Sequence, residues 1–307
     1  MKRILGIAIL AALAAAQENA VFTTGVSLVH VDVEVVDGSR LLNGFTKDSF
    51  RILDNSVPQK ILHFSQEEES IDIILLFDVS GSMKPKLERV AAAAHVALAE
   101  LRPGDRVAVM SFTGRARLLA RFTEDLAAVE KTIQQDVLQR ARGGTRILAA
   151  VNDAAKVFLQ EPRTRRRRAV LIVTDNHGMV SGSSRTVVEN LWEADAILSG
   201  LQIRQGVETA ALTVRKIMNP MALAMDSESM TKVAEQTGGD VLKSGDPGEN
   251  FQEMIRRIRL RYSLYYAQPE AKPGSERKIK VTLADDEQRK HPQGRVRARF
   301  GYRVPGN

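Results

Sequence analysis

Residues 71–261 alternate between continuous apolar runs and segments with helical spacing, and this alternation restricts the fold more than any other feature. Ile71–Phe77 has Asp72 as its only charge, as expected for a strand that is buried on both faces of a parallel sheet. Helical spacing follows over Lys86–Leu101, and Pro103-Gly104 ends it. The repetition predicts an α/β fold with a doubly wound, mostly parallel, Rossmann-like sheet and helices on both faces.

The same alternation continues to residue 261. The expected later strands are Val107–Phe112, Arg117–Phe122 as its hairpin partner, Ala169–Thr174, Ile197–Ile203 at a sheet edge, and Val241–Leu242. The expected helices are Leu126–Arg140, Ile147–Leu159, Thr186–Ala194, Ser227–Thr237 and Phe251–Leu260. The pattern assigns no element to Arg204–Asp226.

The flanking segments, 21–66 and 262–304, have the two-residue period of β-strands instead. In the first, apolar side chains alternate with His30, Asp32 and Glu34. The expected strands are Arg51–Leu53, Lys60–Phe64, Tyr262–Ala267, Lys278–Leu283 and Arg295–Tyr302, with turns over Pro269–Ser275 and Asp285–Gly294. Since the α/β domain (71–261) separates the two segments, we expect them to pair with each other as a small β-sandwich-like domain.

The first 16 residues have the features of a signal peptide. Lys2 and Arg3 precede the uncharged, apolar run Ile4–Ala16, which ends in three alanines and is shorter than the roughly 20 residues of a membrane span. We expect an exported protein, periplasmic or extracellular, without an integral membrane span after cleavage; the alternative is an uncleaved anchor. The absence of cysteine excludes disulfides and thiolate sites. Aromatic residues make up 5% of the chain, too few for a nucleic-acid stacking platform, so we expect no nucleic-acid partner.

Oxygen-bearing side chains gather where the predicted central strands end. Asp78-Val79-Ser80-Gly81-Ser82 follows the first strand, Thr145 follows two glycines, and Asp175 ends a later strand. Open α/β sheets bind ligands at this edge. Two carboxylates and three hydroxyls, without nitrogen or sulfur, suit Mg²⁺, Mn²⁺ or Ca²⁺. The alternative interpretation is helix capping, because Asp and Ser are good N-caps.

This constellation resembles the metal-ion-dependent adhesion site of von Willebrand factor type A domains, and the resemblance covers roughly residues 71–261. The flanks, Val31–Phe64 and Tyr262–Tyr302, resemble the outer parts of bacterial exported proteins related to this family. The resemblance implies a Mg²⁺ (or Mn²⁺ or Ca²⁺) ion that bridges to an acidic residue of a protein partner. It assigns five metal ligands: Asp78, Ser80, Ser82, Thr145 and Asp175. Asn176-His177 departs from the family pattern, which usually has glycine directly after the aspartate.

Basic residues flank the proposed site. They are Lys84, Lys86, Arg115 and Arg146, and His177 lies beside Asp175. A positive rim favours an acidic partner; the alternatives are ordinary surface charge and, for His177, a solvated loop. The run Arg163–Arg168 precedes a buried strand, and we interpret it as a solvated loop at the opposite sheet edge rather than a nucleic-acid or lipid patch.

These features predict a metal-dependent adhesion or interaction module that binds a protein partner. The alternative is a structural component of a cell-envelope assembly with a vestigial metal site. A metal-assisted hydrolase needs an activated water and usually a nearby general base. The sequence has neither a Gly-x-Ser-x-Gly elbow nor a His-Glu-x-x-His pair, so we predict no catalytic residues and no enzyme.

Overall fold

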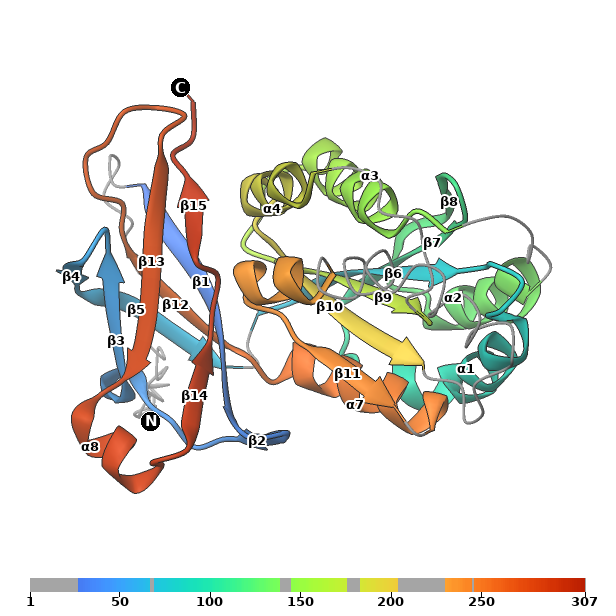
Figure 1. The fold of residues 1–307 in the computed structure, drawn as a ribbon, viewed down its shortest axis with the longest axis horizontal. Helices are drawn as coiled ribbons and strands as arrows, with labels where there is room; N and C mark the ends of the chain where they lie inside the picture. The colour runs from blue at the N-terminus through green and yellow to red at the C-terminus, as the bar shows by residue number, and fades with distance from the viewer. Residues whose placement is uncertain are drawn as a thin grey trace, which may run out of the picture.

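The computed structural model describes residues 27–66, 69–138, 145–175, 183–203, 230–244 and 246–306. In these ranges a six-stranded central sheet with helices lies beside two smaller sheets (Figure 1). The predicted α/β fold is confirmed. The predicted signal peptide (1–16) and the unassigned segment Arg204–Asp226 lie outside the described residues.

The central sheet has the strand order β11-β10-β9-β6-β7-β8. All its neighbouring pairs are parallel except β7–β8, which is an antiparallel hairpin. The prediction that Ile197–Ile203 lies at an edge is wrong, because β11 pairs with the last four residues of β10. The bounds are β6 (Ile71–Asp78), β7 (Arg106–Phe112), β8 (Ala116–Thr123), β9 (Arg167–Thr174), β10 (Ala196–Ile203) and β11 (Val241–Ser244).

Helices cover both faces of the central sheet. One face packs against α1 (Lys84–Leu98), α2 (Leu126–Thr132) with a following π-helical turn (Ile133–Val137), and α7 (Pro247–Arg259). The other packs against α3 (Ile147–Gln160), α4 (Ser184–Glu193) and helical residues 230–237. Along β6, Ile73 and Leu75 join the first apolar cluster, whereas Ile74 and Leu76 join the second. The continuous apolar run of β6 therefore follows from helices on both sides.

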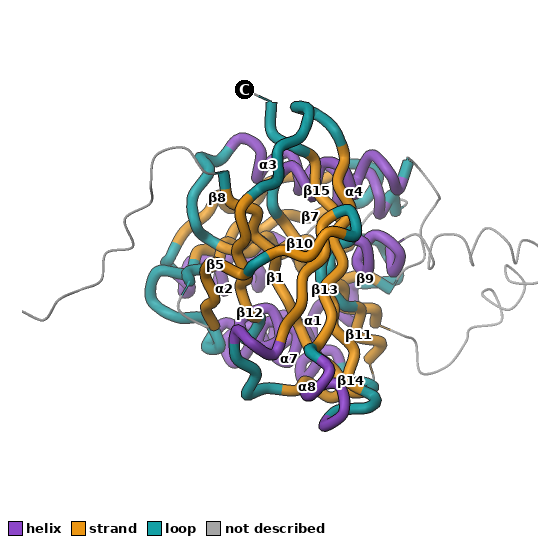
Figure 2. Tube along the Cα trace, turned by 90° about the vertical axis from the view of Figure 1, so that its left-hand side faces the viewer, coloured by secondary structure: helices purple, strands orange, loops and turns teal. Residues whose placement is uncertain are grey.

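Two outer sheets, built from strands before β6 and after α7, lie at one end of the central sheet (Figures 1 and 2). The first has the order β14-β1-β12-β5, with β2 also paired to β1, and the second has the order β15-β13-β3-β4. Apolar side chains from both outer sheets form one cluster. The bounds are β1 (Leu28–Asp37), β2 (Arg40–Leu42), β3 (Phe50–Asp54), β4 (Val57–Gln59), β5 (Ile61–Gln66), β12 (Tyr262–Ala267), β13 (Glu276–Leu283), β14 (Gly294–Arg297) and β15 (Gly301–Arg303).

Two local predictions near the C-terminus are wrong. The single strand expected over Arg295–Tyr302 is divided into β14 and β15, which belong to different sheets. Between them the chain turns to the central unit, which is the central sheet with the helices that cover it. There the Phe300 N–H donates to the Gln236 carbonyl at 2.9 Å. The expected turn contains a short helix, α8 (Asp285–Lys290), whose acidic first turn and basic last turn complement the helix dipole.

Charged residues join the outer sheets to the central unit. The polar face of β1 is buried: Asp32 is 7% exposed and Glu34 is 1% exposed. Arg167 lies 3.8 Å from the Asp32 carboxylate, and Arg261 lies 3.5 Å from that of Glu34. Arg163 and Arg165 are exposed, but Arg167 and Arg168 are buried, so the solvated-loop prediction is wrong for the end of the arginine run. Because a buried charge is costly without a partner, these pairs fix how the two parts face each other.

Candidate metal centre

The loop after β6 curls around the carboxylate of Asp78. This side chain is fully buried, and its Oδ1 accepts a hydrogen bond from the backbone N–H of Ser80 at 3.0 Å, which is an Asx-turn. The chain then turns at Gly81, and the Met83 N–H donates to the Ser80 carbonyl at 3.0 Å. The curl brings the hydroxyl oxygens of Ser80 and Ser82 to 3.3 Å from each other. Ser80 is buried, whereas Ser82 is exposed, so the site opens toward solvent at Ser82.

A residue that the sequence analysis did not single out completes the environment of Asp78. The hydroxyl of Thr174, at the end of β9, donates to Asp78 Oδ2 at 2.7 Å. Burial raises the pKa of Asp78, and the charge of Asp175 adds to this, while the hydrogen bonds from Thr174 and Ser80 oppose it. One feature of the sequence could have indicated this role: Thr174 is a hydroxyl residue at the end of the strand that pairs with β6.

Thr145 and Asp175 lie on loops at the same sheet edge. Asp175 follows β9, which pairs with β6, and its side chain is fully buried. Thr145 is also buried and precedes α3. Its loop is attached to the end of β7 through the Arg146 N–H, which donates to the Thr113 carbonyl at 3.1 Å. The Val79 N–H in turn donates to the Phe112 carbonyl at 3.0 Å, so both the Asp78 loop and the Thr145 loop are hydrogen-bonded to the end of β7.

Lys86 is buried, whereas the sequence analysis placed it among the basic residues of the rim. It is 9% exposed, and its Nζ lies 2.7 Å from Asp175 Oδ2. It is therefore a buried partner of a predicted metal ligand, because α1 begins directly after the Asp78 loop and its first turn faces the end of β9. Lys84, Arg115 and Arg146 are exposed, as a rim requires, whereas His177 lies outside the described residues.

The donor chemistry fits a hard divalent cation. Asp78, Ser80, Ser82, Thr145 and Asp175 offer carboxylate and hydroxyl oxygens, the ligand type that Mg²⁺, Mn²⁺ and Ca²⁺ prefer. Within the described ranges, no group of three or more His, Cys, Asp or Glu side chains could hold a metal. A site at this edge consequently depends on hydroxyl ligands, and one of its two carboxylates, Asp175, is paired with Lys86.

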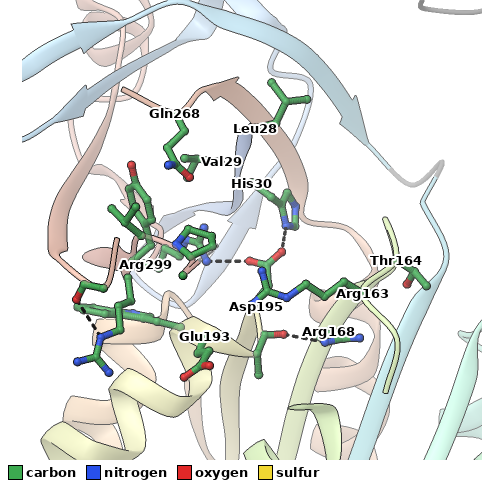
Figure 3. A pocket seen from close by; sticks show the side chains of 18 of the residues that line it. Leu28, Val29, His30, Arg163, Thr164, Arg168, Glu193, Asp195, Gln268 and Arg299 are labelled. Atoms are coloured by element: carbon green, nitrogen blue, oxygen red, sulfur yellow. Dashed lines mark hydrogen bonds and ion pairs between the residues drawn. The ribbon is translucent and has the colours of Figure 1, made fainter. Parts of the chain in front are cut away.

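A cavity of about 360 Å³ lies elsewhere, between the outer sheets and the amino ends of β9 and β10 (Figure 3). At its wall, Asp195 Oδ2 lies 2.9 Å from His30 Nδ1, and Asp195 Oδ1 lies 2.7 Å from Arg299 Nη1. Arg168 also lines the cavity and donates to the Pro162 carbonyl at 2.7 Å. None of the predicted metal ligands lines this space, which is a junction between the two parts of the molecule.

Comparison with known protein families matches one part of the chain. Residues 73–178, which include all five predicted metal ligands, match the von Willebrand factor type A domain. The resemblance to von Willebrand factor type A domains is confirmed over these residues. No curated protein matches the sequence.

Several solved structures are similar to this chain. An aerotolerance-related membrane protein from Bacteroides fragilis has 16% identity over 62% of this chain and 98% of its own, with a TM-score of 0.47. BatB from Bacteroides thetaiotaomicron has 17% identity over the same shares, with a TM-score of 0.46. A von Willebrand factor type A protein from Catenulispora acidiphila has 13% identity over 92% of this chain and 75% of its own, with a TM-score of 0.46.

Proposed function

We propose that this protein is an exported protein-binding module in which a divalent cation bridges to an acidic residue of a partner. The observation that carries the proposal is the Asp78 loop, where two hydroxyl oxygens lie 3.3 Å apart beside a buried carboxylate. Ser82 is exposed, so a partner can reach this point from solvent. The match of residues 73–178 to the von Willebrand factor type A domain supports an interaction or adhesion role.

The proposed ion is Mg²⁺, with Mn²⁺ and Ca²⁺ as alternatives. Asp78, Ser80, Ser82, Thr145 and Asp175 would hold it, and neutral hydroxyls would leave much of its positive charge available to an outside carboxylate. The exposed cations Lys84, Arg115 and Arg146 would attract the same acidic partner, because complementary charge speeds encounter and rejects like-charged surfaces.

The direction of the central strands agrees with a binding site that partners can reach. The arrowheads of β6, β9 and β10 point away from the outer sheets, so the proposed site lies at the far end of the central unit (Figure 1). We infer that the outer sheets form a β-sandwich-like base, and support comes from the single apolar cluster that they share. Among the described residues, no helix is both long and apolar enough to cross a membrane.

The second candidate is a structural component of a cell-envelope assembly whose metal site is vestigial. The ion pair between Lys86 and Asp175 favours it, because one predicted ligand already has a cationic partner. Both candidates are non-enzymatic, and this is supported by the absence of a Gly-x-Ser-x-Gly elbow and of a His-Glu-x-x-His pair from the sequence.

Metal binding is the test that separates the two candidates. Chelator-stripped protein would be titrated with Mg²⁺, Mn²⁺ and Ca²⁺ in a calorimeter, alongside the Asp78→Ala variant. We expect saturable binding to the native protein and a loss of about 100-fold or more in the variant, since even second-shell changes cost 10–100-fold. The matched control is Asp286→Ala, which removes the same charge from an exposed position on α8 and leaves binding unchanged.

The partner is tested separately with metal-loaded protein. Short peptides that contain one Asp or Glu would be compared with their Asn or Gln counterparts, in the presence of Mg²⁺ and of chelator. Binding that needs both the acid and the metal supports the bridge. Metal binding without any preference for the acidic peptides contradicts the bridge, and absence of metal binding favours the structural role.

A further inference from the structure

A lysine lies inside the proposed metal site. Lys86 belongs to the first turn of α1, and its Nζ contacts Asp175 Oδ2 at 2.7 Å. The Lys86 side chain is 11% exposed, and that of Asp175 is fully buried. Because α1 follows β6 and Asp175 follows β9, the ion pair connects two of the loops that would hold the ion.

The two carboxylates of the site have different partners. Asp175 faces a positive charge, whereas the hydrogen bonds to Asp78 come from the neutral groups of Thr174 and Ser80. Within the described ranges, Asp78 makes no ion pair. A buried carboxylate without a cation is strongly disfavoured, so Asp175 is satisfied before any metal arrives.

We infer that Lys86 is a built-in cation of this site: it balances Asp175 and limits how tightly the site holds a divalent ion. This inference rests on the proposed function, because it concerns the same site. Two like charges near one carboxylate repel each other, and both are attracted to the same oxygens. The lysine therefore lowers metal affinity and keeps the loops together in the absence of metal.

The test removes the charge of Lys86 and measures both metal binding and stability. Lys86→Met removes the ammonium and keeps the length of the side chain. Lys86→Gln keeps a hydrogen-bond donor for Asp175 and secures a folded variant if the first does not fold. Mn²⁺ would be titrated calorimetrically into each chelator-stripped protein, and Tm would be measured with and without Mn²⁺.

We expect both variants to bind Mn²⁺ at least tenfold more tightly than the native protein. The metal-free Lys86→Met variant melts at a lower temperature, because Asp175 has lost its cation, and Mn²⁺ raises its Tm by more than that of the native protein. Lys86→Arg keeps the charge and does not gain affinity. The matched control is Lys156→Met, an exposed lysine in the C-terminal half of α3 and outside the proposed site and its rim, which changes neither quantity.

The outcomes separate this inference from the proposed function. If the native protein binds Mn²⁺ and both Lys86 variants bind it equally or less tightly, the inference is overturned and the metal bridge stands. If only the Lys86 variants bind, the inference is supported and the native protein does not use a metal bridge. If no protein binds Mn²⁺, both are overturned.

Discussion

At the scale of single residues, Asp78 is held by neutral donors on both carboxylate oxygens. The Thr174 hydroxyl and the Ser80 backbone N–H occupy Oδ2 and Oδ1, and the side chain is fully buried. Hydrogen bonds to a charged group are stronger than neutral ones, and a lost partner leaves a buried acceptor unsatisfied. Thr174 therefore matters to the site although we expect no direct contact with the ion.

Thr174→Val tests this role, because valine has nearly the same shape and lacks the hydroxyl. We expect the free energy of unfolding to fall by about 1–3 kcal/mol, the cost of leaving one buried polar group without its partner. Urea denaturation of metal-free protein measures it. Thr186→Val, at an exposed position on α4, is the control and changes stability by less than about 0.5 kcal/mol. Equal effects of the two substitutions would contradict the assigned role.

At the scale of elements, the sequence pattern predicts strands that are buried throughout and helices whose buried positions recur with the helical period. β6 has apolar clusters on both faces, so its apolar run was sufficient to place it. The pattern did not predict the position of strands that depends on contacts with segments distant in the sequence. β14 and β15 separate because Phe300 bonds to Gln236, which is remote in sequence. Likewise, the position of β10 depends on β11, a strand of only four residues.

The C-terminal end of α7 depends on one remote arginine. Arg167, at the start of β9, donates to the carbonyls of Ile258, Arg259 and Arg261 at 3.3, 2.8 and 3.1 Å. These groups lie where a helix leaves its last carbonyls without partners. Because β12 begins directly after Arg261, this contact also fixes how the chain enters the outer sheets.

Arg167→Met removes this cap and also leaves the buried Asp32 without its nearby arginine. We expect a loss of about 3–5 kcal/mol in the free energy of unfolding, as for other broken buried ion pairs. Urea denaturation would measure it, with Arg163→Met, an exposed arginine of the same run, as the control. A loss in Arg167→Met no larger than in the control would show that the arginine is not a structural cap.

At the scale of the whole molecule, the sequence predicted which side chains lie together where those residues are close in the chain. The spacing of Asp78, Ser80 and Ser82 is local, and each strand end was visible as the end of an apolar run. The direction of Lys86 was not visible, because a long side chain in a first helical turn can point to solvent or back over the loop. The sequence did not predict the charged junction either. Its acidic and basic residues come together only when the outer sheets meet the central unit.

That junction makes the stability of the molecule depend on pH. His30, on β1, contacts Asp195, which lies between α4 and β10 (Figure 3). The ring of His30 also stacks on that of Tyr265, with 4.8 Å between the ring centroids. Burial by itself lowers the pKa of His30, but the carboxylates of Asp195, Asp32 and Glu69 outweigh it, so the net shift is upward. The pKa of Asp195 is lowered: burial opposes this, but His30, Arg299 and Arg168 together prevail.

The sign of the effect follows from linkage between protonation and folding. A raised pKa means that the folded state binds the His30 proton more tightly than the unfolded state, whose histidine pKa is about 6.5. This stabilisation is complete below pH 6.5 and is lost as the pH rises through the folded-state pKa. Over the same range Asp195 stays ionised in both states and adds no slope, because its lowered pKa acts only in acid.

We therefore expect the free energy of unfolding to decrease as the pH rises above about 6.5, and His30→Gln to remove most of that decrease. Urea denaturation at half-unit steps of pH measures both proteins. His95→Gln is the control, because the His95 side chain is 80% exposed beside Glu130 and should leave the pH profile as it is. A native profile that is flat or rises over this range would mean that the folded protein binds the His30 proton no more tightly than the unfolded chain does. Asp195 would then keep its ion pair with Arg299 and a neutral hydrogen bond with His30.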